Sequence, residues 1–400
     1  WVMLLNTFIA IIVAYFQKTG AIQSFSQMIH DKNLSRRGAQ LMAWVLGIFV
    51  YFSDSFSPLF VGSTMRSITD KARISREKLA YIADSTSAPV SVLVPITGWA
   101  AYLSGLAVGI GCIVTEEDGS ALFLKAIPYN FYAVLTIVMM IAMVVMRVEY
   151  GPMKVHEDNA KKGDIYTTPD RPYANAEEET VDNGKGKVMD LLIPIISLII
   201  CCVIGMIYTG GFFDGVGFVE AFSGSDASQG LVYGSFFAFV ITIVLYLVRR
   251  VLKFDECMAC LPDGFKAMVP AILILVFAWT LKSMTDSLGA AEYVAGIVAG
   301  SAEGMVNLLP AIIFLVGCFL AFATGTSWGT FGILIPIVVD AFQATNPTLM
   351  TIAISACMAG AVCGDHCSPI SDTTIMASAG AQCNHVNHVS TQLPYAVSVA

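Results

Sequence analysis

Several stretches of the chain hold about twenty consecutive, mostly apolar residues, the length that an α-helix needs to cross a lipid bilayer. They lie at about 1–16, 121–148, 188–208, 230–250 and 266–286. Lipid cannot hydrogen-bond the backbone N–H and C=O groups, and a helix pairs these groups with one another inside a single segment. Of the 400 residues, 56% are hydrophobic and 13% are charged, whereas soluble domains carry roughly 25% charged residues. The sequence therefore predicts an all-α polytopic membrane protein.

Two further apolar stretches are interrupted by a proline that follows a carboxylate and small hydroxyl groups. The first, at about 81–103, contains DSTSAP at 84–89, and the second, at about 349–373, contains DHCSPISDTT at 365–374. Buried charge and proline are tolerated inside membrane segments where the chain lines a site. Paired broken helices of this kind predict the binding site of an ion-coupled transporter.

Two other segments, at about 38–65 and 304–340, contain two apolar arms around a polar middle. The middle holds Asp54 in the first segment and Thr324-Gly325-Thr326-Ser327 in the second. We expect both to be re-entrant hairpins, in which two half-helices meet near the membrane midplane.

The two halves of the chain share this order of features. Residues 52–55 match residues 322–325 at nearly the same offset, and Pro89 matches Pro369. We therefore predict a first repeat at 1–148, a hydrophilic linker at 149–187 and a second repeat at 188–400. Because the chain starts at Trp1 and stops at Ala400 within an apolar run, we expect both repeats to be incomplete at their outer ends.

The distribution of Lys and Arg predicts the orientation. These residues cluster at 32–37, 66–78, 147–187 and 249–253, whereas the connections 112–120, 209–229 and 287–303 contain none. Basic loops usually face the cytoplasm. The topology that satisfies this rule places the linker 149–187 in the cytoplasm and gives the second repeat the inverted orientation, as alternating access needs.

Oxygen atoms around the breaks and hairpin tips form the candidate site. Proline lacks an N–H, so Pro58, Pro89 and Pro369 are expected to free the carbonyls of Asp54, Ser85 and Asp365. Carboxylate, hydroxyl and carbonyl oxygens suit a hard cation such as sodium. Desolvation favours a neutral carboxyl group and a nearby cation favours an ionised one, so a buried aspartate would hold a proton or a sodium ion but not both. We expect the site to consist of Asp54, Asp84, Ser85, Thr86, Thr324, Thr326, Ser327, Asp365, Ser368, Asp372 and Thr373.

Other interpretations stay open. Each proline can mark an ordinary kink whose freed carbonyl binds a hydroxyl, and Asp54 can cap a half-helix. Lys282 either pairs with Asp286 at the membrane interface or faces the site. A zinc site and a membrane metalloenzyme are a further alternative, with the ligands drawn from Cys363, His366, Cys367, Cys383, His385 and His388. Their spacing matches no standard zinc motif, and the chain holds no phosphate loop or nucleophile elbow, so we expect a protein that is not an enzyme.

The segment CGDHCSPISDTT at 363–374 closely resembles the signature of the NhaC family of sodium/proton antiporters. Residues 323–330, 277–289 and 83–99 are also similar to that family. The resemblance implies a multi-pass transporter of the bacterial inner membrane that exchanges intracellular sodium for external protons and needs no cofactor. Some relatives exchange organic acids, such as malate against lactate, together with sodium and protons. The expected partners are therefore sodium, protons and the lipid bilayer, with a small organic anion and a second copy of the chain as further candidates and no nucleic acid.

Overall fold

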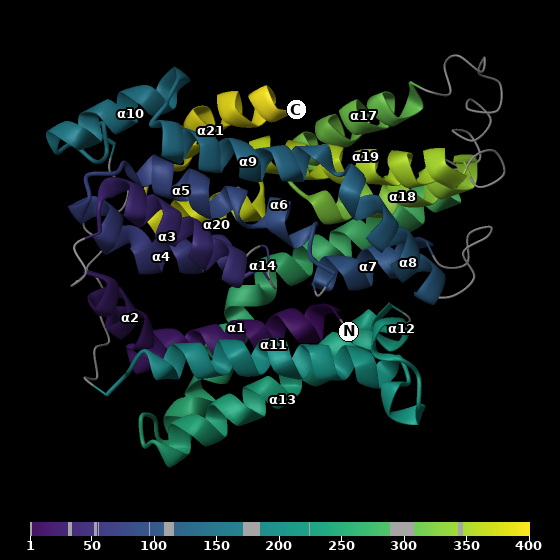
Figure 1. Cartoon of the computed structure of the whole chain (residues 1–400), viewed down its shortest axis with the longest axis horizontal. Helices are drawn as coiled ribbons and strands as arrows, with labels where there is room; N and C mark the ends of the chain where they lie inside the picture. The colour runs from purple at the N-terminus through teal and green to yellow at the C-terminus, as the bar shows by residue number, and fades with distance from the viewer. Residues whose placement is uncertain are drawn as a thin grey trace.

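The computed structural model describes residues 2–30, 34–51, 54, 56–95, 97–107, 116–170, 185–223, 225–288, 308–342 and 347–400. Within these ranges every regular element is helical (Figure 1). The α-helices are α1 (Val2–Thr19), α2 (Ala21–His30), α3 (Arg36–Phe49), α4 (Phe56–Lys71), α5 (Arg76–Ser85), α6 (Ala88–Ser91), α7 (Gly98–Ala107), α8 (Glu116–Ala126), α9 (Phe131–Met146), α10 (Gly151–Lys162), α11 (Met189–Thr209), α12 (Phe218–Ser223), α13 (Ala227–Val248), α14 (Phe254–Ser287), α17 (Leu309–Thr324), α18 (Ser327–Phe342), α19 (Pro347–Cys367), α20 (Asp372–Ala381) and α21 (His385–Val399), with 3-10 turns η1 (Ile127–Tyr129) and η2 (Phe212–Asp214).

The apolar stretches form long helices, which confirms the predicted all-α polytopic class. Four helical segments of the described chain are long and apolar enough to cross a membrane: Phe131–Lys162, Met189–Thr209, Gln229–Val248 and Pro347–Cys367. The predicted spans 188–208 and 230–250 correspond to α11 and α13, and the span 266–286 forms the larger part of α14.

The single span predicted at 121–148 was wrong. Helix α8 ends at Ala126, the turn η1 follows, and α9 starts at Phe131. Pro128 cannot donate a backbone hydrogen bond, and the side chain of Asn130 accepts one from the Ala133 N–H at 3.2 Å. This cap starts a new helix, so apolar composition hid a helix boundary.

The helices form two groups (Figure 1). Helices α1, α11 and α13 pack together in the lower part of the view, and α14 contacts both α1 and the upper helix α18. The upper group contains the two segments predicted as hairpins, α3–α4 and α17–α18, and the two broken helices, α5–α6 and α19–α20. Both helix interruptions fall where the proline motifs predict them.

The two halves pack across one another. Helix α4 of the first hairpin packs on α20 of the second broken helix, and α18 of the second hairpin contacts α7, which follows the first broken helix. A Cβ atom added at Gly62 would lie 2.6 Å from the backbone of Gly380, so α4 and α20 touch through their backbones. The inverted relation of the repeats and their boundaries remain predictions.

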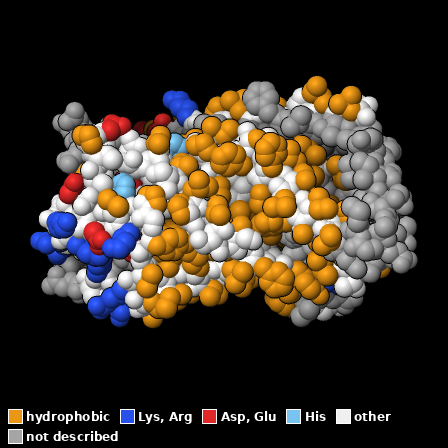
Figure 2. All heavy atoms as spheres, turned by 90° about the horizontal axis from the view of Figure 1, so that it is seen from above, with side chains coloured by type: hydrophobic (Ala, Val, Ile, Leu, Met, Phe, Trp, Pro, Cys, Tyr) orange, Lys and Arg blue, Asp and Glu red, His pale blue; other side chains and the backbone are white. Residues whose placement is uncertain are grey.

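One face of the molecule separates apolar from charged side chains (Figure 2). Apolar side chains cover the middle of this view, and Lys and Arg gather at the left end. The exposed apolar residues include Phe131, Leu135, Val138, Val145 and Met146 of α9. An apolar band beside a charged end is the surface that a bilayer and its aqueous boundary require.

Part of the segment 149–187 differs from the solvated linker that its composition suggests. Residues 151–162 form α10, which packs against α5 and α21. The Glu157 carboxylate accepts the backbone N–H of Ser75 at 2.8 Å and pairs with Arg36. This part of the segment therefore belongs to the folded body, whereas residues 171–184 lie outside the described residues.

Candidate functional site

Asp365 lies in the last turn of α19, directly before the helix break. Its side chain is buried, and the Ser327 hydroxyl donates a 2.5 Å hydrogen bond to Asp365 Oδ2. Ser327 is the first residue of α18 and follows the hairpin tip at Gly325. The other carboxylate oxygen, Oδ1, has no hydrogen-bond partner among the described residues.

The tip of the second hairpin reaches the break because of Gly325. This residue has φ = 68° and ends α17 in the left-handed conformation that glycine adopts without strain. A Cβ atom there would lie 2.7 Å from the carbonyl oxygen of Ile370, inside the break between α19 and α20. The turn thus brings Ser327 to Asp365.

Asp84 forms a second buried carboxylate near the end of α5. Its Oδ2 accepts hydrogen bonds from Gln392 Nε2 at 2.6 Å and from Thr374 Oγ1 at 3.2 Å. The Nε2 atoms of His388 and His366 lie 3.6 Å and 4.0 Å away from it. Asp84 Oδ1 has no partner among the described residues, and the residue is fully buried.

The two histidines near Asp84 differ in their bonding. His366 Nδ1 contacts the Tyr132 hydroxyl at 2.9 Å, and its Nε2 contacts Ser85 Oγ at 3.2 Å. Neither ring nitrogen of His388 has a hydrogen-bond partner within the described part of the chain. Gln392 Nε2 donates both to Asp84 and to the carbonyl of His366, the residue after Asp365, so the two carboxylates lie in one region.

Asp54 occupies the tip of the first hairpin. Its Oδ2 accepts the indole N–H of Trp99 at 2.7 Å and that of Trp328 at 3.0 Å. Trp328 is the second residue of α18 in the second hairpin, so the two hairpin tips meet through this contact. The tip neighbours at 52, 53 and 55 lie outside the described residues.

The remaining predicted site residues bond mainly within their own surroundings. Thr86 donates to the Ile82 carbonyl and Thr324 to the Leu320 carbonyl, each within its own helix. Ser368 donates to the Phe322 carbonyl of the second hairpin at 2.8 Å. The hydroxyls of Thr373 and Ser371 share a hydrogen bond, Asp372 accepts the Thr373 N–H, and Thr326 accepts the Gly329 N–H.

Two of the three carbonyls expected to be unpaired have partners. The Asp365 carbonyl accepts the backbone N–H of Ser368 at 2.9 Å, because the helix tightens before Pro369. The Asp54 carbonyl accepts the Ser87 hydroxyl. The expectation of free carbonyls at these two positions was wrong, and side-chain oxygens are left to carry the cation chemistry.

Sequence reasoning missed Trp99, Trp328 and Gln392, and it considered His388 only as a zinc ligand. His388 and Gln392 are four residues apart on α21, so they share one helix face. The four-residue spacing of this polar pair was the signal that could have found them.

The zinc alternative gains no support from the structure. Among the described residues, no group of three or more His, Cys, Asp or Glu side chains is arranged to hold a metal ion. The side chains of Lys282 and Asp286 lie outside the described residues, and their pairing stays untested.

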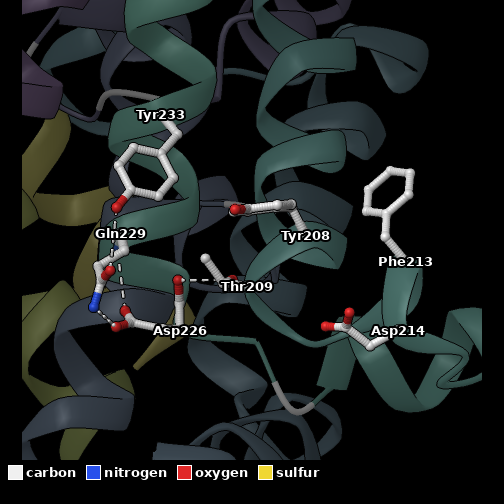
Figure 3. A pocket seen from close by; sticks show the side chains of 7 residues that line it. All are labelled: Tyr208, Thr209, Phe213, Asp214, Asp226, Gln229 and Tyr233. Carbon is white, nitrogen blue, oxygen red and sulfur yellow. Dashed lines mark hydrogen bonds between the residues drawn. The ribbon is translucent and has the colours of Figure 1, made fainter.

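A separate hollow of about 400 Å³ lies at the ends of α11 and α13, lined by Tyr208, Thr209, Phe213, Asp214, Asp226, Gln229 and Tyr233 (Figure 3). Asp226 caps α13, since its Oδ1 accepts the Gln229 N–H and its Oδ2 the Gln229 side-chain amide. Figure 3 shows these bonds turned toward the helix start. None of the residues that line this hollow belongs to the candidate ion site around Asp84 and Asp365.

Comparisons with known proteins agree with the helical fold. The solved structure of Neisseria gonorrhoeae MtrF, described as illuminating a class of antimetabolite efflux pumps, shares the fold with a TM-score of 0.51. It is 13% identical and covers 99% of this chain and 78% of its own. An uncharacterized Haemophilus influenzae protein is 38% identical over 406 residues, covering 100% of this chain and 76% of that protein.

The helical fold and a match to a family of transporters place the chain among secondary membrane transporters rather than enzymes. The sequence model of the Na+/H+ antiporter family matches residues 99–400. The chain belongs to the Na+/H+ antiporter family.

Proposed function

We propose that this chain exchanges sodium ions for protons, as a member of the NhaC branch of its family. The observation that carries the proposal is Asp365, a buried carboxylate with one oxygen bonded to Ser327 and the other without a partner in the described structure. A buried carboxylate oxygen without a partner is unfavourable, and either a proton or a sodium ion would relieve it.

The chemistry of Asp365 supports competition between the two ions. Protonation neutralises the carboxyl group and removes its attraction for sodium, and bound sodium stabilises the carboxylate and displaces the proton. One site that holds either ion, facing the two sides of the membrane in turn, is enough for exchange. No covalent step is needed.

Asp84 supplies a second buried negative charge to the same region. Unlike Asp365, it has two imidazole rings within 4.0 Å. Chains of Asp and His inside membrane proteins commonly mark proton pathways. We therefore assign Asp365 to the competition with sodium and Asp84 with its imidazoles to the handling of protons.

Organic-acid exchange remains the second candidate, because the resemblance to the NhaC family includes such relatives. It would need hairpin hydroxyls that face an organic carboxylate. The Thr324 hydroxyl donates instead to the Leu320 carbonyl of its own helix, so its hydrogen is already used. Exchange of the two ions stays the first candidate because Asp365 offers a buried carboxylate oxygen to either ion.

Purified protein in liposomes tests the proposal. A sodium gradient should drive an opposite pH change that a pH-sensitive dye reports, and adding malate or lactate should not alter its rate. Sodium-dependent proton movement that requires malate or lactate would favour the organic-acid exchanger. Protein-containing vesicles that behave like empty ones under every gradient would contradict both.

A further inference from the structure

Asp54 joins three elements that are far apart in the sequence. Its Oδ2 accepts the indole N–H of Trp99, which lies on α7, and that of Trp328, which lies on α18. Asp54, Trp99 and Trp328 are only 6%, 2% and 8% exposed. Hydrogen bonds to an ionised acceptor are stronger than those between neutral groups, and burial strengthens them further.

Neighbouring contacts hold both the indoles and the hairpin tip in place. The rings of Trp99 and Trp328 meet edge to face with centroids 5.8 Å apart, and the Tyr102 hydroxyl donates to the Trp328 carbonyl. Ser87, in the first helix break, donates to the Asp54 carbonyl. The tip is therefore fixed through both its side chain and its backbone.

The first two residues of α18 connect these contacts to the candidate ion site. Ser327 bonds to Asp365 at 2.5 Å, and the next residue, Trp328, bonds to Asp54 at 3.0 Å. Successive side chains of a helix point in directions about 100° apart, so one turn can serve two sites. Because the two residues share a peptide bond, displacing Trp328 also displaces the Ser327 hydroxyl.

We propose that Asp54, Trp99 and Trp328 form a clamp that positions Ser327 on Asp365 and thereby sets the sodium affinity of the site. In this role Asp54 is a positioning residue and not a sodium ligand. The inference rests on the proposed sodium–proton exchange, which the wild-type protein tests separately.

Trp328→Phe and Trp99→Phe test the clamp, because each keeps an aromatic ring and removes one N–H donor. The sodium concentration for half-maximal exchange should rise about tenfold in each, equivalent to about 1.4 kcal/mol. The maximal rate should change less than twofold, since Asp365 itself is intact. Asp54→Asn keeps an acceptor oxygen and should retain more sodium affinity than Asp54→Ala.

Trp44→Phe is the matched control. Trp44 lies on α3 of the first hairpin, and its indole N–H has no hydrogen-bond partner among the described residues. This variant loses the same group as the two clamp variants, but it loses no clamp contact. Its sodium dependence should equal that of the wild type.

Three outcomes would overturn the clamp while wild-type exchange stands. The first is unchanged half-saturation in both clamp Phe variants, and the second is a fall in maximal rate alone, which indicates a packing role. The third applies if the Phe variants fail to insert into the membrane: Asp54→Asn and Asp54→Ala then bind sodium with equal affinity. Wild-type protein without sodium-dependent exchange would instead remove the proposed function, and the clamp with it.

Discussion

Single side chains decide how the candidate site holds its charge. Asp365 and Ser327 are 38 positions apart, and their hydrogen bond joins the second broken helix to the second hairpin. A hydrogen bond to a charged group contributes about 1.5–3 kcal/mol, so this hydroxyl has a measurable influence on an ionised Asp365. The same chemistry recurs at Asp84, where Gln392 and Thr374 donate.

We predict that Ser327→Ala weakens sodium binding. The change removes a donor that stabilises the ionised carboxylate, so the sodium concentration for half-maximal exchange should rise roughly tenfold, or about 1.4 kcal/mol. Ser355→Ala is the control, because the buried Ser355 hydroxyl on α19 has no hydrogen-bond partner in the described structure. Equal sodium dependence of the two variants in liposomes would show that Ser327 does not support the site.

The sequence predicted which carboxylates belong to the candidate site better than it predicted their hydrogen-bond donors. The motifs drew attention to Asp84 and Asp365 because carboxylates are rare in apolar segments. They did not predict that Trp99 and Trp328 share Asp54, or that Gln392 reaches Asp84 across more than three hundred residues. Tertiary packing selects these donors, and a short motif carries no information about it.

Whole elements followed the sequence where apolar length or proline defined them. The helix breaks before Pro89 and Pro369 were predicted correctly, since proline removes a donor wherever it occurs. The boundary at Pro128 was missed because apolar residues continue on both sides. Helix α10 was missed because charge pairing, rather than apolar area, holds Glu157 against the protein.

The packing of α10 predicts that trimming the segment 149–187 affects the stability of the protein. Removal of residues 156–183 would delete Glu157 and His156, which are both buried, so it should destabilise the protein rather than leave it unaffected. Glu157→Gln isolates the effect, since it weakens the contacts to Ser75 and Arg36 and should lower the thermal unfolding midpoint by several degrees. Asp158→Asn, one residue on, loses only the partly exposed ion pairs with Lys154 and Lys161 and should change the midpoint much less. Equal unfolding midpoints for the two variants would show that the Glu157 contacts of α10 do not stabilise the protein.

The whole molecule is organised by contacts between its halves. Helix α4 packs on α20 and helix α18 packs on α7, so each hairpin contacts part of the other half. These contacts hold the two halves together, and the inverted orientation of the second repeat stays a prediction. Loop charges predicted the orientation from sequence, but pairings between distant helices depend on the close approach of residues such as Gly62 and Gly380.

Inverted repeats predict opposite exposure of the two hairpin entrances. Ser35, which precedes α3, should face the cytoplasm, and Leu308, which precedes α17, should face the opposite side. A cysteine introduced at either position should react with a membrane-impermeant thiol reagent only from its own side, with the parent chain as background. Labelling of both positions from the same side in oriented vesicles would contradict the inversion.

We propose that Asp365 is the carboxylate for which sodium and protons compete. Asp365→Asn keeps the shape of the side chain but removes both its charge and its proton, whereas Asp365→Glu keeps the charge and moves it by one methylene. Losing a charged ligand from a desolvated site should lower sodium affinity about a thousandfold, or roughly 4 kcal/mol. The decisive measurement is the sodium-driven pH change in liposomes, normalised to inserted protein. We predict no exchange for the Asn variant and shifted but detectable exchange for the Glu variant. Near-normal exchange by Asp365→Asn would show that sodium and protons do not compete for Asp365.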